Sequence, residues 1–66
     1  MPAQWTGELV GKMHNHRISA TELAKEAGLT RPYLSMILNG HRNPTDIQYR
    51  LEDALGRLIM KKEASA

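Results

Sequence analysis

Apolar residues recur every three or four positions along four stretches of this chain, a spacing that predicts amphipathic α-helices. The stretches cover about residues 5–15, 20–27 and 30–39, and a region that begins near residues 45–46. We therefore predict an all-α fold of four compactly packed helices, or of five if Gly56 divides the last one.

The apolar face of each predicted helix defines the residues that we expect in the core. These are Leu9, Val10 and Met13 in the first helix, Leu23, Ala24 and Ala27 in the second, Leu34, Ile37 and Leu38 in the third, and Ile47, Leu51, Ala54, Leu55 and Leu58 in the fourth. We expect Trp5, at the start of the first helix, to cover the edge of this core.

A second apolar patch lies on roughly the opposite face of the fourth helix. Tyr49, Gly56 and Met60 form it, with Ile59 at its margin. A few exposed apolar side chains are normal in a monomer. A small domain can also use such a patch to dimerise, and we predict Tyr49, Ile59 and Met60 at a dimer interface.

The residues at the helix ends support these boundaries. Ser19 and Glu22 have the spacing of a capping box, and Thr30 can cap the following helix. Gly28 and the pair Asn39-Gly40 end the second and third helices, since glycine adopts a left-handed conformation without a steric penalty. A second possible capping box joins Thr45-Asp46 to Gln48 at the start of the last helix.

Residues 19–40 therefore predict two short helices joined by a glycine turn. Ala24 and Ala27 are small enough to let the two helices cross closely. Such a pair is the unit that places its second helix in the major groove of DNA. A generic helical hairpin without a DNA role is the alternative.

The same stretch resembles the helix-turn-helix of the Cro/lambda-repressor-like family of small phage and bacterial regulators. The resemblance covers roughly residues 9–58 and rests on Leu23-Ala24, Ala27-Gly28-Leu29, Leu34, Ile37, Asn39-Gly40 and Asn43-Pro44. It implies a lambda-repressor-like fold and an operator of double-stranded DNA, which regulators of this class usually bind as homodimers at two-fold sites.

The resemblance also implies which residues meet DNA. They are Ala20, Thr30, Arg31, Pro32, Tyr33, Ser35, Met36, Asn39, Arg42 and Asn43. In related regulators, the residues that match Arg31, Pro32 and Met36 face base edges. The residues that match Asn39, Arg42 and Asn43 face phosphates. The backbone amide of Ala20 would approach a phosphate, and Ser35 could meet either a base or a phosphate.

One pair of positions departs from the family pattern. Many members pair an arginine of the first helix with a glutamate of the recognition helix, and the matching residues here are Met13 and Leu38. Replacing both charges by apolar side chains is often neutral or stabilising. We therefore expect an aliphatic contact between these two residues.

Charge is distributed unevenly, although the net charge is only +2. No acidic residue occurs from Ala27 to Thr45, a segment that contains Arg31, His41 and Arg42. An acid-free, basic surface favours the release of counterions from DNA phosphates.

The composition narrows the remaining possibilities. With 66 residues, we expect a single domain over residues 1–66. The chain contains no cysteine, no apolar run of transmembrane length and no secretory leader, so we expect a cytoplasmic protein of a bacterial or phage-infected cell. We find no nucleophile beside a base and no glycine-rich phosphate loop, and expect no enzyme, cofactor, metal or small-molecule ligand.

Three functions fit these features. The first is a sequence-specific transcriptional regulator, a repressor of phage or mobile-element type. The second is a protein-interaction module of the same fold, such as an antirepressor. Its protein partner could contact the outward apolar side chains of Pro32 and Met36. The third is the DNA-binding antitoxin of a toxin–antitoxin pair.

Overall fold

The computed structural model describes residues 4–42, 44 and 46–65. Four helices make up this part of the chain: α1 (Gln4–Asn15), α2 (Ala20–Ala27), α3 (Arg31–Leu38) and α4 (Ile47–Ser65). The all-α prediction is confirmed, and α4 continues through Gly56, so the described residues contain no fifth helix.

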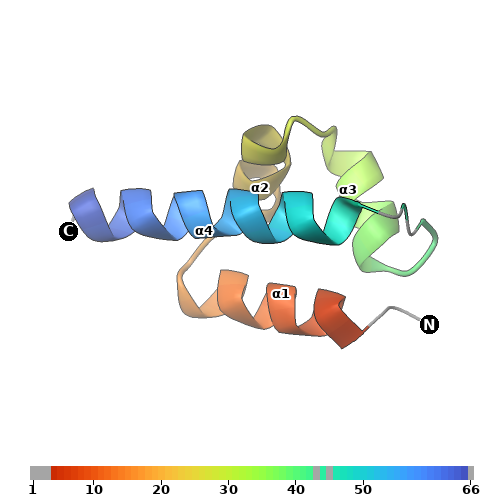
Figure 1. The fold of residues 1–66 in the computed structure, drawn as a ribbon, viewed down its shortest axis with the longest axis horizontal. Coiled ribbons are helices and arrows are strands. Elements are labelled where there is room, and N and C mark those ends of the chain that lie inside the picture. Colours follow the sequence, from red (N-terminus) through yellow and green to blue (C-terminus); the bar gives the residue numbers. More distant parts are fainter. Residues whose placement is uncertain (1–3, 43, 45, 66) are drawn as a thin grey trace.

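The long helix α4 organises the molecule. Figure 1 shows α1 along one side of α4 and α2 along the other, with α3 at the end where α4 begins. Contacts join α4 to α2 and α1, and α3 to α2 and α1. The helices α2 and α3 are therefore supported by α4 and α1, which lie on the side opposite to the exposed face of α3.

An aliphatic core fills the space between the helices. Its buried members are Leu9, Met13, Ile18, Leu23, Ala24, Leu34, Ile37, Ile47, Leu51, Ala54, Leu55 and Leu58. The largest completely buried side chains, Leu23, Leu34, Ile37 and Leu51, come from α2, α3 and α4. Burying each one stabilises the fold by about 1.5–3 kcal/mol. Within this core α2 packs on α4, and α3 packs on α2 and α1.

The predicted inward face of α1 is wrong at one position. The side chain of Val10 is 45% exposed, whereas Thr6 is 2% exposed. Leu9, Met13 and Thr6 lie on one side of the helix, and Val10 lies about 100° from Leu9, beyond the edge that α3 and α4 cover. Trp5, Ala27 and Leu38 are partly buried and pack against the core.

The predicted caps of α2 and α3 are confirmed. The amide of Glu22 donates to Ser19 Oγ and the amide of Ser19 donates to Glu22 Oε1, both at 3.1 Å. Thr30 Oγ1 accepts a hydrogen bond from the Tyr33 amide at 3.3 Å. At the start of α4, Gln48 Nε2 donates to Glu52 Oε2, and the Thr45 half of the predicted second capping box lies outside the described residues.

Three helices end in the same backbone motif. After α2 the amides of Gly28 and Leu29 donate to carbonyl groups of the last turn, and Gly28 has a φ of 74°. After α3 the amides of Gly40 and His41 donate in the same way, and Gly40 has a φ of 82°. After α1 the left-handed position holds Arg17, with a φ of 57°, instead of a glycine. All three match the Schellman motif, and Arg17 is the unusual residue among them.

In the part of the chain that the structure describes, no helix is both long and apolar enough to cross a membrane.

Candidate nucleic-acid interface

The third helix, α3, buries one face and presents the other to solvent. Leu34 and Ile37 are buried against the core and fix the rotation of the helix. The residues on the opposite face are exposed: Arg31, Pro32, Ser35, Met36 and Asn39. This is the arrangement that a recognition helix needs, because its packing side chains and its reading side chains occupy different faces.

A hollow of about 480 Å³ lies between this exposed face and the first residue of α2. Its lining residues are Ala20, Arg31, Pro32, Ser35, Leu38 and Asn39. Five of the ten residues predicted to meet DNA thus line one concave surface. Leu38, expected to point inward, is half-buried and forms part of this surface as well as packing on the core.

The structure assigns the remaining predicted DNA residues to different surroundings. Thr30 is the N-cap of α3, and Tyr33 is partly buried against the core. Met36 and Arg42 are exposed but do not line the hollow. Asn43 lies outside the described residues.

Ser35 and Asn39 are joined one turn apart on the exposed face of α3. Asn39 Nδ2 donates to the backbone carbonyl of Ser35 at 2.8 Å and to Ser35 Oγ at 3.2 Å. Because a carbonyl oxygen can only accept, the amide nitrogen of Asn39 must face it. Nothing in the sequence pattern indicated that these two residues are hydrogen-bonded.

The acidic residues of α2 are paired with cations of α4. Glu26 accepts from Arg57 Nε at 3.0 Å and from Lys61 Nζ at 2.8 Å. Glu22 lies 3.5 Å from Lys62 Nζ. These carboxylates therefore face cations rather than presenting unpaired negative charge. Sequence patterns did not predict the pairs of Glu26, since the partners are 31 and 35 positions apart.

These contacts shift the pKa values of the groups involved. Hydrogen bonds from Lys61 and Arg57 lower the pKa of Glu26, although partial desolvation opposes them. The pKa of Glu22 is lowered chiefly by the hydrogen bond from the Ser19 backbone amide, and Lys62 adds to the effect. The hydrogen bond to Glu26 raises the pKa of Arg57. All of these shifts favour the charged forms.

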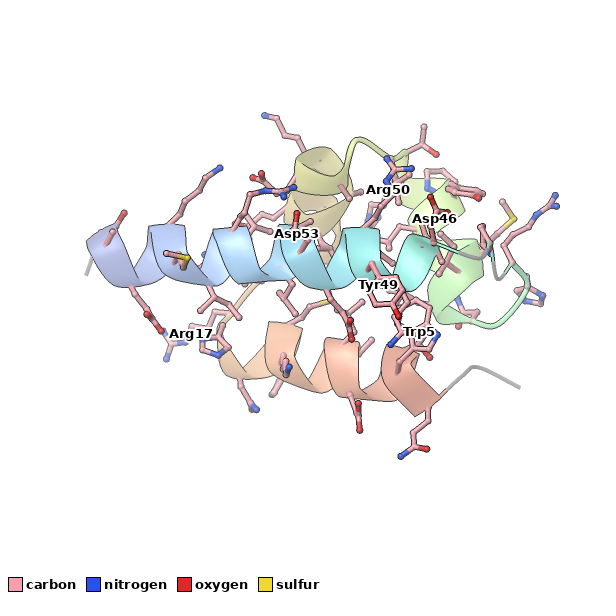
Figure 2. The ribbon with its side chains drawn as sticks, viewed as in Figure 1. Trp5, Arg17, Asp46, Tyr49, Arg50 and Asp53 are labelled. Atoms are coloured by element: carbon pink, nitrogen blue, oxygen red, sulfur yellow. The ribbon has the colours of Figure 1, made fainter. Side chains whose placement is uncertain are left out.

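An arginine from α4 holds the end of α2. Arg50 Nη2 donates to the carbonyl oxygen of Ala27 at 2.9 Å, at the turn that separates α2 from α3. Figure 2 shows the Arg50 side chain reaching from α4 towards this turn. Arg57 Nη2 makes a similar bond to the carbonyl of Glu26 at 3.3 Å. The contacts tie the geometry of the helix pair to α4.

Two short helices, a left-handed glycine between them and an exposed second helix define a helix-turn-helix DNA-binding domain. The chain belongs to the helix-turn-helix family of Cro/C1 type, and the match to that family covers residues 15–57. It is therefore a DNA-binding regulator of this class. The matched range contains α2, α3 and the first part of α4. Comparisons with curated proteins and with solved structures found no match.

Proposed function

We propose that the protein is a sequence-specific repressor that inserts α3 into the major groove of a short two-fold operator. The observation that supports this most directly is the hollow between Ala20 and the exposed face of α3. A DNA strand lying along it would bring a phosphate to the backbone amide of Ala20 at the N-terminus of α2, while α3 faces the bases.

The side chains on α3 suggest what the helix reads. Arg31 carries paired donors that suit the O6 and N7 acceptors of guanine. Pro32 and Met36 have no hydrogen-bond donors, and their exposed apolar groups suit thymine methyl groups. Arg42 and Asn43, which follow α3 in the sequence, are proposed to contact phosphates.

The homodimer is proposed from the outer face of α4. Tyr49 is 73% exposed and Met60 is 71% exposed, so both apolar side chains are available to a second copy of the chain. Ile59 packs partly against its own core and would contribute less. Light scattering should show a dimer for the native protein and a monomer for the double variant Tyr49→Glu, Met60→Glu. An unchanged mass would overturn this interface.

The experiment for the proposed function is selection from a random pool of duplexes, followed by a salt titration on the best site. We expect a short palindrome, and an affinity that falls steeply with salt. Arg31→Ala should relax the preference at one base pair and cost about 1–3 kcal/mol there. Lys12→Ala removes the same charge from the hollow between α1 and α4, and serves as the matched control.

A protein-interaction module would behave differently in the same experiment. It would enrich no sequence over the random pool, and Arg31→Ala and Lys12→Ala would have equal effects on weak, charge-driven binding. That outcome would overturn the repressor proposal.

A further inference from the structure

The Ser35–Asn39 pair leaves two specific groups available on the recognition face. The two hydrogens of Asn39 Nδ2 match its two acceptors, the carbonyl oxygen and Oγ of Ser35. Within the described residues, the hydroxyl hydrogen of Ser35 has no acceptor and Asn39 Oδ1 has no donor. The pair therefore offers one donor, from Ser35, and one acceptor, from Asn39.

Both groups belong to the surface that would meet a base. Ser35 and Asn39 line the same hollow as Arg31 and Pro32. Asn39 is bonded to the helix itself, so its amide is held in one orientation before any ligand arrives. Such a preorganised group loses little conformational freedom on binding.

We propose that Ser35 and Asn39 act as a unit that reads one adenine in the major groove. Adenine presents an acceptor, N7, beside a donor, the N6 amino group. Guanine presents two acceptors, so its O6 would oppose Asn39 Oδ1. Cytosine presents only a donor, and thymine an acceptor beside a methyl group. Adenine alone matches both groups of the pair.

This inference rests on the proposed insertion of α3 and changes the role of Asn39. The family resemblance assigns Asn39 to a phosphate. With Nδ2 turned towards Ser35, however, the amide presents its oxygen outward, and a phosphate oxygen would be repelled by it. Asn39 is therefore assigned to a base and, through its bond to Oγ, directs the Ser35 hydroxyl outward.

The test uses base analogues at each adenine of the selected site. Replacing adenine by 7-deazaadenine removes the N7 acceptor, and replacing it by purine removes the N6 amino group. At one adenine of each half-site we expect each analogue to weaken binding of the native protein by about 2- to 10-fold, the effect of one lost hydrogen bond.

Variants assign each loss to one side chain. Ser35→Ala should no longer respond to 7-deazaadenine at that adenine, whereas Ser35→Thr, which keeps the hydroxyl, should still respond. Asn39→Ala should no longer respond to purine. A side chain that only stabilises α3 would lower the melting temperature without abolishing the response to one particular analogue, so melting curves accompany each variant.

Three results would overturn the proposal. If a palindrome is selected but no adenine responds to both analogues, the base assignment is wrong while the DNA-reading function stands. If Asn39→Ala weakens binding to all duplexes equally and keeps the response to purine at every adenine, Asn39 contacts a phosphate. If no sequence is selected, the proposed function fails and this inference fails with it.

Discussion

Arg50 and Ala27 are joined by a hydrogen bond of 2.9 Å between the guanidinium group and the backbone carbonyl, although they lie 23 positions apart in the chain. The carbonyl of Ala27 belongs to the last turn of α2, whose carbonyl groups have no partner within the helix. Through this bond, α4 fixes the point at which the chain turns from α2 into α3.

Arg50→Met should remove this bond while keeping much of the aliphatic length of the side chain. We expect a loss of about 1 kcal/mol in the free energy of unfolding, or roughly 4–8 °C in melting temperature for a domain of this size. Thermal unfolding followed by circular dichroism measures it. Arg42→Met, at an exposed residue after α3, is the control and should leave the melting temperature almost unchanged.

Arg17→Gly should stabilise the fold. Arg17 occupies a left-handed position with a φ of 57°, which costs a residue with a Cβ about 1–2 kcal/mol. Glycine avoids that penalty but loses more freedom on folding, so we expect a net gain of about 0.5–1 kcal/mol. Urea unfolding gives the value, and a midpoint that falls would contradict the assignment of Arg17 as the strained end of α1.

Gly28→Ala is the converse substitution at the equivalent position after α2. A Cβ there would lie 3.8 Å from Arg50 Nη2, an ordinary contact, so space is not the obstacle. The φ of 74° is unfavourable for alanine, and we expect a loss of about 1 kcal/mol in urea unfolding. Gly7→Ala, within α1 and with open space around it, should instead raise stability because alanine favours helix.

The ion pairs of Glu26 predict how stability depends on pH. The pKa of Glu26 in the folded protein is lowered from its ordinary value of 4.5 by Lys61 and Arg57. Its contribution is therefore fully present above pH 4.5 and is lost as the pH falls through the lowered pKa. Melting temperatures between about pH 7 and pH 3 should fall less for Glu26→Gln than for the native protein.

The control for this pH experiment is Glu63→Gln, at an exposed residue near the end of α4. It should leave the pH profile nearly parallel to that of the native protein. Added salt should reduce the difference between the native protein and the Glu26→Gln variant, because exposed pairs are screened. Equal pH profiles for this variant and the native protein would show that the ion pairs contribute nothing measurable.

Leu38→Glu should destabilise the protein by about 1–3 kcal/mol, since it places a charge against the apolar core without a partner. Met13 is buried and holds the position that carries an arginine in many relatives. Adding Met13→Arg to Leu38→Glu should therefore recover part of the loss. A melting temperature unchanged by Leu38→Glu, or no recovery in the double variant, would contradict the predicted Met13–Leu38 contact.

Much of the site followed from sequence because its components are local. The hydrogen bonds of Ser19 with Glu22 and of Thr30 with Tyr33 span three positions, so the residue types alone predict them. The rotation of α3 follows equally from Leu34 and Ile37, which must face the core. The same reasoning misplaced Val10, because the width of a buried helix face depends on its neighbours.

The four helices, most of the aliphatic core and the outward face of α3 can be predicted from sequence, since capping and helical periodicity are properties of neighbouring residues. Only the folded molecule shows that Glu26 pairs with Arg57 and Lys61. The same holds for the hydrogen bond from Arg50 to the carbonyl at the end of α2. These contacts depend on how α4 lies against α2. That arrangement comes from packing the whole core, which no spacing along the chain encodes.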